Sequence, residues 1–342
     1  MNGGRMYLGA VGTALPGEPV GNATLGKLLG VSDEWIDIFV GTETRHFGRD
    51  LGTGEVLRTL TDLCAEAGAQ AMAAAGLEPA DIEFLVLATA TPDTLLPTTA
   101  TQTADLLGLD HLPAYQLQAG CSGAVQALDL AGALLGAGRR TGLVIGGDVT
   151  HRHLDLDRDL TDLTAEELVN YLIFGDGAGA AVLSTEPIGE AVEIKAVLNR
   201  FVGLGRPPGQ LVDWYGVSDR HSPRRMLTED YKEIESSVPE LAAEAVWDLL
   251  ELTGWQAEEV AHLLPPQLSG AMTDRIVARL ALPGAREVSC VRATGNTANA
   301  LPFLQLELLL DGFGEGERAL AVSIESSKWI KTGFALERAG RR

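Results

Sequence analysis

The chain has 342 residues and a formal net charge of −21, with 26 lysine and arginine residues against 47 aspartate and glutamate residues. Hydrophobic residues make up 46% of the chain and charged residues 21%, which is typical of a folded globular protein and excludes a disordered one. The acidic balance also excludes a nucleic-acid binder, because such a protein needs a basic surface to displace counterions.

The sequence contains no apolar run long enough to cross a membrane. The N-terminal segment lacks the apolar stretch that is typical of a secretory signal. The three cysteines, Cys64, Cys121 and Cys290, are too few for a disulfide framework. We therefore expect a cytoplasmic protein without a membrane segment.

Short apolar runs alternate with helical patterns along the chain, which predicts an α/β architecture. Apolar spacing predicts a helix over residues 55–76 with Thr53 as its N-cap, and a second helix over 239–254 with Ser237 as its N-cap. A helix of small residues is expected directly after Cys121. Glycine-flanked apolar runs predict buried strands at 84–88, 114–118, 142–146, 171–174 and 180–183.

Three segments of the first half recur in the second half, in the same order and at nearly the same separation. Residues 75–88 match 253–266, residues 120–122 match 295–297, and residues 141–145 match 318–322. The repeat predicts two halves of similar fold, residues 1–184 carrying Cys121 and residues 185–342 carrying Asn296. A pseudo-twofold relation between them would place both side chains at equivalent strand-to-helix corners that face one cavity.

Cys121 is the first candidate for chemistry, because it lies in a Gly-Cys-Ser-Gly corner between a predicted strand and a predicted helix. The positive end of a helix dipole lowers the pKa of a thiol, which favours a nucleophile at this position. The alternative is a buried, inert cysteine. We expect that inert state for Cys64, within a helix, and for Cys290, in a short strand.

The glycine-rich segment 174–180, Phe-Gly-Asp-Gly-Ala-Gly-Ala, is the second unusual feature. A phosphate-binding loop would continue with lysine and serine or threonine, and would lead into a helix. Here an apolar strand pattern follows instead. We therefore expect a tight turn between strands.

Five motifs appear in a characteristic order: Asp33-Glu-Trp-Ile36, Ala90-Thr-Pro-Asp93, Gly120-Cys-Ser-Gly-Ala124, Phe174-Gly-Asp-Gly-Ala-Gly-Ala-Ala-Val-Leu183 and Gly295-Asn-Thr297. Together they resemble the β-ketoacyl-acyl carrier protein synthase III family of the thiolase superfamily, over nearly the whole chain. The resemblance implies an α/β fold of two pseudo-repeated halves in five layers, α-β-α-β-α. It also implies a homodimer that carries an acyl group on a cysteine, with a coenzyme A or phosphopantetheine thioester as substrate, an acyl carrier protein as partner, and neither a metal nor a permanently bound cofactor.

The resemblance assigns the reactive cysteine to Cys121 and the catalytic asparagine to Asn296. The family's catalytic histidine falls on Pro266, and the asparagine of the same motif falls on Ser269, which we assign to substrate binding. Proline offers no side-chain donor, and Gln267 beside it donates a hydrogen bond without exchanging a proton. We assign Gln267 to the catalytic set in place of the histidine, and we expect decarboxylative condensation with malonyl groups to be impaired.

Other positions carry the resemblance further. Trp35 matches the coenzyme A-binding segment, although the basic residue of that segment is Phe39 here. Phe174 matches a phenylalanine next to the reactive cysteine, and Leu96 matches the position that reaches into the acyl tunnel of the partner subunit. The glycine-rich stretch that helps to form the family's oxyanion hole is replaced by Ile324-Glu-Ser-Ser-Lys328.

A relocated base could come from His151 or His153, although a surface position is the alternative for both. Their His-x-His spacing lacks the accompanying cysteine or carboxylate cluster of a metal site. An acidic carrier protein needs a local basic patch on a chain of this charge. The candidates for that patch are Arg139, Arg140, Arg224, Arg225, Arg275 and Arg279.

These features favour an acyltransferase of secondary metabolism that loads Cys121 and passes the acyl group to an alcohol, amine or thiol acceptor. One alternative is a decarboxylative carbon–carbon condensing enzyme with a rearranged site. Another is a catalytically silent subunit that binds acyl chains or a partner.

Overall fold

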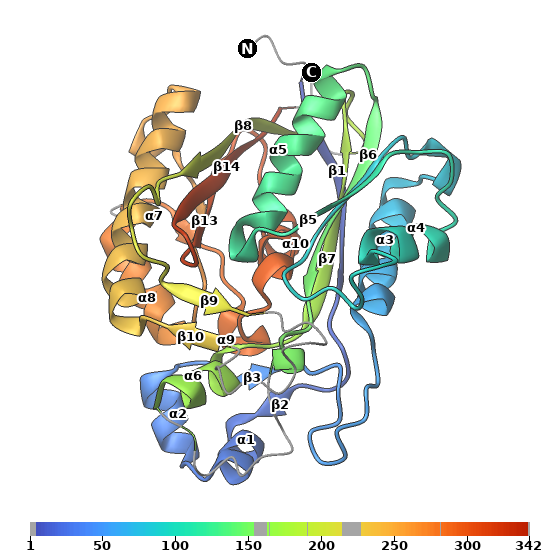
Figure 1. The fold of residues 1–342 in the computed structure, drawn as a ribbon. Coiled ribbons are helices and arrows are strands. Elements are labelled where there is room, and N and C mark those ends of the chain that lie inside the picture. The colour runs from blue at the N-terminus through green and yellow to red at the C-terminus, as the bar shows by residue number, and fades with distance from the viewer. Residues whose placement is uncertain are drawn as a thin grey trace.

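The computed structural model describes residues 5–153, 163, 165–189, 191–213, 227–280 and 282–340. Within these residues, a ten-stranded mixed sheet runs in the order β12-β11-β13-β14-β8-β1-β7-β6-β4-β5, and β2–β3 and β9–β10 form two small sheets (Figure 1). The strands are β1 (Tyr7–Ala14), β2 (Val20–Gly21), β3 (Thr44–Arg45), β4 (Leu85–Ala88), β5 (Ala114–Leu117), β6 (Thr141–Asp148), β7 (Gly177–Ser184), β8 (Val192–Phe201), β9 (Gln210–Val212), β10 (Leu227–Glu229), β11 (His262–Leu264), β12 (Arg286–Glu287), β13 (Arg318–Glu325) and β14 (Ile330–Arg338).

Helices cover both outer faces of the large sheet, and two further helices lie between its two halves (Figure 1). The helices are α1 (Asn22–Leu29), α2 (Asp33–Phe39), α3 (Leu60–Ala75), α4 (Thr99–Leu106), α5 (Gly123–Gly136), α6 (Ala165–Ile173), α7 (Tyr231–Thr253), α8 (Gly270–Leu280), α9 (Val291–Thr294) and α10 (Leu301–Leu310). Helices α3 and α4 pack on β1, β7, β6 and β4, whereas α7 and α8 lie outside β8, β14 and β13. Helices α5 and α10 lie between the two halves of the sheet, so the predicted α-β-α-β-α layering is confirmed.

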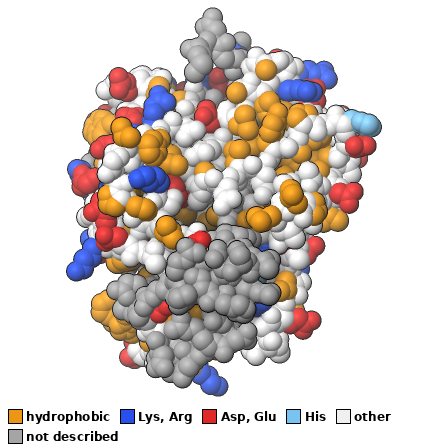
Figure 2. Space-filling view, in the orientation of Figure 1, with side chains coloured by type: hydrophobic (Ala, Val, Ile, Leu, Met, Phe, Trp, Pro, Cys, Tyr) orange, Lys and Arg blue, Asp and Glu red, His pale blue; other side chains and the backbone are white. Residues whose placement is uncertain are grey.

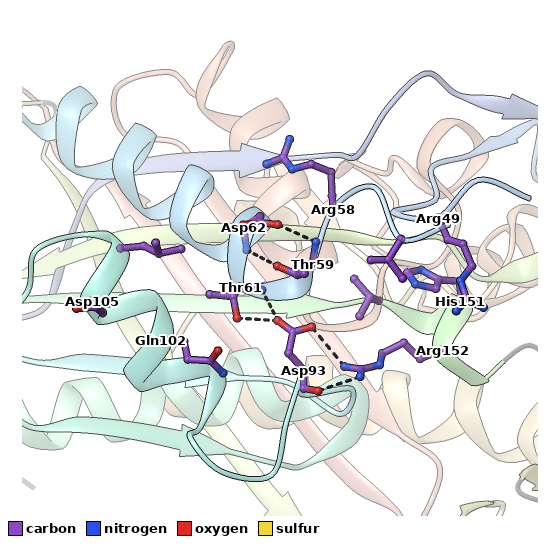
Figure 3. A pocket seen from close by; sticks show the side chains of 13 residues that line it. Arg49, Arg58, Thr59, Thr61, Asp62, Asp93, Gln102, Asp105, His151 and Arg152 are labelled. Carbon is purple, nitrogen blue, oxygen red and sulfur yellow. Dashed lines mark hydrogen bonds and ion pairs between the residues drawn. The ribbon is translucent and has the colours of Figure 1, made fainter. Parts of the chain in front are cut away.

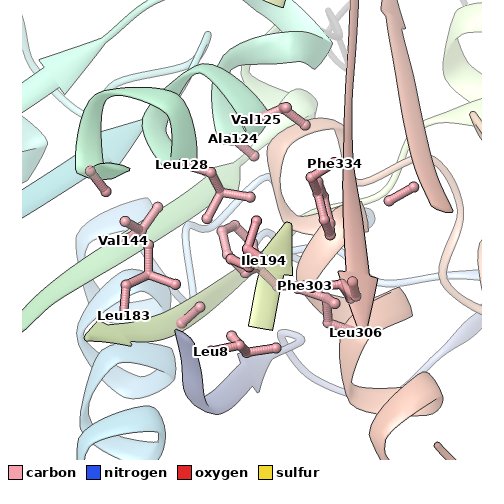
Figure 4. Close-up of a cluster of buried hydrophobic side chains, with 14 of the residues drawn as sticks. Leu8, Ala124, Val125, Leu128, Val144, Leu183, Ile194, Phe303, Leu306 and Phe334 are labelled. Carbon is pink, nitrogen blue, oxygen red and sulfur yellow. The ribbon is translucent and has the colours of Figure 1, made fainter. Parts of the chain in front are cut away.

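Side chains from both halves of the chain fill the central layer. Leu128 of α5 and Phe303 and Leu306 of α10 pack with Leu183 of β7 and Phe334 of β14 (Figure 4). None of these five side chains is more than 1% exposed. Burial of each such side chain stabilises the fold by roughly 1.5–3 kcal/mol, so both halves depend on one shared core.

The strand order reads alike from either edge of the large sheet. From one edge it is β5-β4-β6-β7-β1, and from the other it is β12-β11-β13-β14-β8. The repeated segments of the sequence occupy matching places, since β4 corresponds to β11 and β6 corresponds to β13. Because β1 pairs directly with β8, the sheet continues across the boundary between residues 184 and 185, and that boundary stays a prediction.

Helix α3 begins later than its apolar spacing predicted. It begins at Leu60, and Thr59 caps it in place of Thr53. Thr59 Oγ1 accepts the N–H of Asp62 at 3.1 Å, and an Asp62 oxygen accepts the N–H of Thr59 at 2.9 Å. This reciprocal pair satisfies donors at the helix start, a local geometry that periodicity does not detect.

Replacing Thr59 with alanine is expected to lower the free energy of unfolding by about 1 kcal/mol, because it removes this cap. The matched control is Thr53→Ala, in the preceding turn, for which we expect a change below about 0.5 kcal/mol. Urea denaturation followed by circular dichroism measures both. Equal losses for the two variants would contradict the assignment of the cap to Thr59.

Two further predicted elements differ from the structure. Helix α7 begins at Tyr231 with Asp230 as its N-cap, and Pro239 lies inside it. Its buried face runs through Val238 and Leu241, so packing outweighs the local cost of proline. The predicted strand at 171–174 is instead the last turn of α6 followed by Phe174, because a short apolar run does not distinguish a strand from a buried helix face.

Candidate active site

Cys121 lies in a 3-10 turn, Gly120–Ser122, between the end of β5 and the start of α5. The Ser323 hydroxyl donates to the carbonyl oxygen of Cys121 at 2.9 Å, which ties this turn to β13. Gly120 has a φ of 52°, and a Cβ there would lie 1.9 Å from Oε2 of Glu325. Glycine is therefore required at this corner, because a buried carboxyl group occupies the adjoining space.

Two cavities meet at Cys121. Phe174, Gln267 and Asn296 line the first. The second has a volume of about 520 Å³, and its walls include Asp148 and Glu325. The pseudo-twofold prediction that Cys121 and Asn296 face a common cavity therefore matches their positions, while their chemical roles stay predictions.

Asn296 reaches the cavity because its backbone is anchored to the segment before β7. Phe174 and Asn296 form an isolated parallel bridge, in which the Asn296 N–H donates to the Ile173 carbonyl at 2.7 Å. Asn296 Oδ1 accepts the N–H of Ala298 at 3.0 Å. The amide nitrogen is thus the group that this side chain has left to offer a bound substrate.

The Gln267 side chain is held by the start of α9. Its Oε1 accepts the backbone N–H groups of Cys290 and Val291 at 2.6 and 2.8 Å. Its Nε2 lies 3.9 Å from Sγ of Cys290. Cys290 is the N-cap residue of α9, so the prediction that it lies in a short strand is wrong. Gln267 and Pro266 both line the cavity, but the oxygen of the Gln267 amide is occupied by this structural role.

The other residues assigned to substrate binding lie apart from Cys121. Ser269 Oγ accepts the N–H of Met272 at 3.2 Å at the beginning of α8. Trp35 packs on Phe39 within α2, with ring centroids 5.0 Å apart. Neither Trp35 nor Ser269 is among the lining residues of the two cavities at Cys121.

Leu96 lies on an exposed hydrophobic surface. It is 83% exposed, and the nearby Leu95 is 64% exposed. Leu106 at the end of α4 is 59% exposed, and Tyr115 of the edge strand β5 is 40% exposed. Figure 2 shows hydrophobic side chains gathered on the upper right of the face that carries β5. Soluble monomers rarely expose such groups together, so this surface is suited to a partner.

The His151 imidazole faces a different cavity, beside Arg49 and Arg152 (Figure 3). Its Nδ1 is hydrogen-bonded to the carboxylate of Asp176, and the side chain is buried. The structure therefore does not support His151 as a relocated base for Cys121. His153 ends the short helical turn at Thr150–His153, and its side chain lies outside the described part of the chain.

The electrostatic surroundings of Cys121 differ from the prediction. Burial raises the pKa of its thiol well above the ordinary value, and the nearby carboxyl groups of Glu325, Asp148 and Glu229 raise it further. The positive helix terminus was expected to lower this pKa, but desolvation and three acidic neighbours outweigh it. A thiol with so raised a pKa would need a proton acceptor before it could act as a nucleophile.

Of the three acidic residues, Asp148 and Glu325 are buried at the cavity walls, and Glu229 is half-buried. Burial raises the pKa of the Glu325, Glu229 and Asp148 carboxyl groups. Glu229 accepts hydrogen bonds from Asn170 and Gln210. The described lining of both cavities is acidic and contains no lysine, arginine or histidine.

Sequence reasoning missed these acidic neighbours for different reasons. Asp148 ends β6 and Glu229 ends β10, and neither lies in a motif that singles it out. Glu325 was visible only as a departure from the family's glycine-rich stretch. That departure was the one signal in the sequence that could have located it.

No group of three or more histidine, cysteine, aspartate or glutamate side chains could hold a metal ion in the described ranges. Over the same ranges, no helix is long and apolar enough to span a membrane.

The candidate docking arginines Arg275 and Arg279 pair with Glu235 and Glu240. Arg224 and Arg225 lie outside the described residues.

Comparison with known proteins shows a matching family model and relatives of similar length. The family model "3-Oxoacyl-[acyl-carrier-protein (ACP)] synthase III" matches residues 115–199. A β-ketoacyl-[acyl-carrier-protein] synthase III of Sphingopyxis alaskensis is 33% identical over 305 residues, which cover 89% of this chain and 89% of that protein.

Two solved structures extend the comparison. One, titled "AbyA1 - tetronic acid condensing enzyme", has a TM-score of 0.94 and 53% identity, and covers 97% of this chain and 99% of that chain. A 3-oxoacyl-(acyl carrier protein) synthase III from Pseudomonas aeruginosa PAO1 has a TM-score of 0.84 and 27% identity, and covers 98% and 99% of the two chains. The similarity therefore extends over nearly the full length of each.

Proposed function

This chain belongs to the 3-oxoacyl-[acyl-carrier-protein] synthase III family of thiolase-like proteins, and from that premise we propose that it is an acyltransferase that carries an acyl group on Cys121. The donor is a carrier-protein or coenzyme A thioester, and the acyl group passes to a second substrate without loss of CO₂. Asn296 donates a hydrogen bond at the site, and Phe174 lines the acyl cavity.

The observation that carries this proposal is the acidic lining of the Cys121 cavities. A malonyl group brings its own carboxylate, which Glu325, Glu229 and Asp148 at the cavity walls would repel when they are ionised. Decarboxylation also leaves an enolate, and Pro266 supplies no donor where the family has its histidine. Loss of one oxyanion donor typically costs ~10²–10³ in rate, so a substrate that needs no decarboxylation fits the site better.

The relative named as a tetronic acid condensing enzyme favours a carbon acceptor over the alcohol, amine and thiol acceptors considered from the sequence, with the alcohol on the acyl group itself. A tetronic acid is a five-membered enol lactone, and making one from two acyl thioesters requires one carbon–carbon and one carbon–oxygen bond. A methylene group between a ketone and a thioester is acidic without decarboxylation. We therefore propose an α-hydroxyacyl group on Cys121 and a β-ketoacyl thioester as the second substrate.

The proposed reaction balances without an added reagent. The methylene carbon attacks the acyl carbon on Cys121, a carbon–carbon bond forms, and the bond to sulfur breaks to free the Cys121 thiol. The hydroxyl group of the transferred unit then attacks the β-ketoacyl thioester. A carbon–oxygen bond closes the ring, and the carrier thiol leaves.

The exposed surface around β5 supports the proposed homodimer. Leu96 lies on that surface, where a partner subunit would cover it. Trp35 on α2 stays a candidate for contact with coenzyme A or the phosphopantetheine arm. Arg275 and Arg279 are paired with Glu235 and Glu240. An acidic carrier protein would therefore have to displace these glutamates to bind the two arginines.

The test compares two second substrates on the same acyl-enzyme. The protein is loaded with an α-hydroxyacyl thioester, and either a β-ketoacyl thioester or malonyl-carrier protein is added. We expect a lactone product with the first and no CO₂ release above background with the second, measured by mass spectrometry and a ¹⁴CO₂ assay. Rapid CO₂ release would favour the decarboxylative condensing enzyme, and failure of any thioester to load would favour the catalytically silent subunit.

A further inference from the structure

Hydrogen bonds from two backbone N–H groups hold the Glu325 side chain next to Cys121. Glu325 is the last residue of β13, and its side chain is buried. Oε2 accepts the backbone N–H of Cys121, and Oε1 accepts the N–H of Ser327 at 2.8 Å. The Ser327 side chain donates a further hydrogen bond to this carboxyl group. A carboxylate accepts about four hydrogen bonds in all, so a lone pair that can take a proton is left.

Among the residues that the structure describes, Glu325 is the best-placed proton acceptor. The described walls of the two Cys121 cavities hold no histidine, and His151 is bound to Asp176 at another cavity. Asp148 accepts several buried donors through both oxygens. Glu325 accepts the backbone N–H of Cys121, and of the nearby carboxyl groups it raises the pKa of the Cys121 thiol most.

We propose that Glu325 is the acid–base residue of the Cys121 site, in place of the family's missing histidine; this inference rests on the proposed function. During loading, the Glu325 carboxylate takes the proton of the Cys121 thiol while sulfur bonds to the acyl carbon, and the donor thiolate leaves with that proton. During transfer, Glu325 takes a proton from the attacking methylene group. The bond between sulfur and the acyl carbon breaks, and Cys121 recovers its proton from Glu325.

The charges around Glu325 define the expected pH dependence. Burial raises the pKa of this carboxyl group, and the charge of Asp148 on β6 raises it further. Hydrogen bonds from Ser327 and Cys121 lower the pKa but do not cancel the rise. Among the described residues, the other titratable groups facing the site are the Cys121 thiol, Glu229 of β10 and Tyr231 of α7. Lys328 donates away from the site to the Arg206 carbonyl. A base acts when ionised, so the rate should rise with pH through a pKa above the ordinary value for glutamate.

The test uses the full-length protein with Glu325→Gln and Glu325→Asp. Each protein is loaded to completion with an acyl thioester, and discharge to the second substrate is followed by intact mass in a single turnover. Loading of Glu325→Gln is also expected to be slower, so incubation is prolonged until loading is complete, which shows that fold and nucleophile are intact. We expect Glu325→Gln to discharge ~10²–10⁴-fold more slowly and to lose the acidic limb of the pH profile. Glu325→Asp, which keeps a titratable group, is expected to retain that limb.

Other outcomes would overturn the inference. Discharge by Glu325→Gln within a few-fold of the unaltered protein, with the same pH profile, would assign Glu325 a purely structural role. Faster loading by Glu325→Gln would identify Glu325 as a group that blocks the Cys121 N–H. Absence of acyl loading in the unaltered protein would remove the proposed function and this inference with it, a result distinct from a defect confined to the Glu325 variants.

Discussion

Replacing Cys121 with alanine is expected to abolish acyl loading and to lower turnover by roughly 10⁴-fold or more, because the covalent intermediate has no other position to form. The measurement is intact mass after incubation with an acyl thioester, followed by peptide mapping of any adduct. The alanine variant should keep the unfolding midpoint of the unaltered protein within a small margin, since the Cys121 side chain borders cavities rather than packed core.

The matched controls are Cys64→Ala and Cys290→Ala. Cys64 is fully buried within α3, and burial raises the pKa of its thiol well above the ordinary value. Burial likewise raises the pKa of Cys290 to about 11. Both variants should load as the unaltered protein does, and an adduct on Cys290 or one that persists without Cys121 would contradict the assignment.

These controls also identify what distinguishes Cys121 from the other cysteines. All three thiols have a raised pKa, so thiol acidity alone does not select the nucleophile. Cys121 differs because it lies on two cavities and beside the carboxyl group of Glu325. Access and a neighbouring proton acceptor therefore define the proposed nucleophile.

Replacing Asp148 with alanine is expected to cost about 3–5 kcal/mol in the free energy of unfolding, because it leaves buried donors without an acceptor. Oδ1 accepts Ala90 N–H at 2.8 Å and Thr91 Oγ1 at 2.9 Å. Oδ2 accepts the side-chain amide of Asn299 at 2.7 Å. Asn299 in turn accepts the N–H of Ala124 at 2.8 Å, so the loss should reach the start of α5 beside Cys121.

The comparison variant is Asp93→Ala, at a partly exposed carboxylate that caps the start of α3. Asp93 accepts the N–H groups of Leu60 and Thr61 at 3.2 and 2.7 Å, and it also pairs with Arg152. Loss of this cap is expected to cost about 1–2 kcal/mol. Urea denaturation of both variants, followed by tryptophan fluorescence, checks the difference. A loss for Asp148→Ala no larger than that for Asp93→Ala would show that the buried network contributes little.

Much of the fold could be predicted from residue order. Continuous apolar runs correctly located β4, β6 and β7, because strands buried on both faces need no polar alternation. The repeat between the two halves anticipated the matching strand orders of the large sheet. The starts of α3 and α7 were missed, since capping by Thr59 and Asp230 depends on local geometry that apolar spacing does not encode.

The sequence by itself determined the family, the five-layer fold class, the corner that holds Cys121, and the loss of histidine at position 266. These features follow from local patterns and from motifs of contiguous residues. The acidic character of the site was decided only by the tertiary structure, because Glu325, Glu229 and Asp148 come from strands far apart in the chain. Burial of the Cys121 thiol, together with these three carboxyl groups beside it, raises its pKa where the helix terminus was expected to lower it. Desolvation and like charge act through space and not along the sequence.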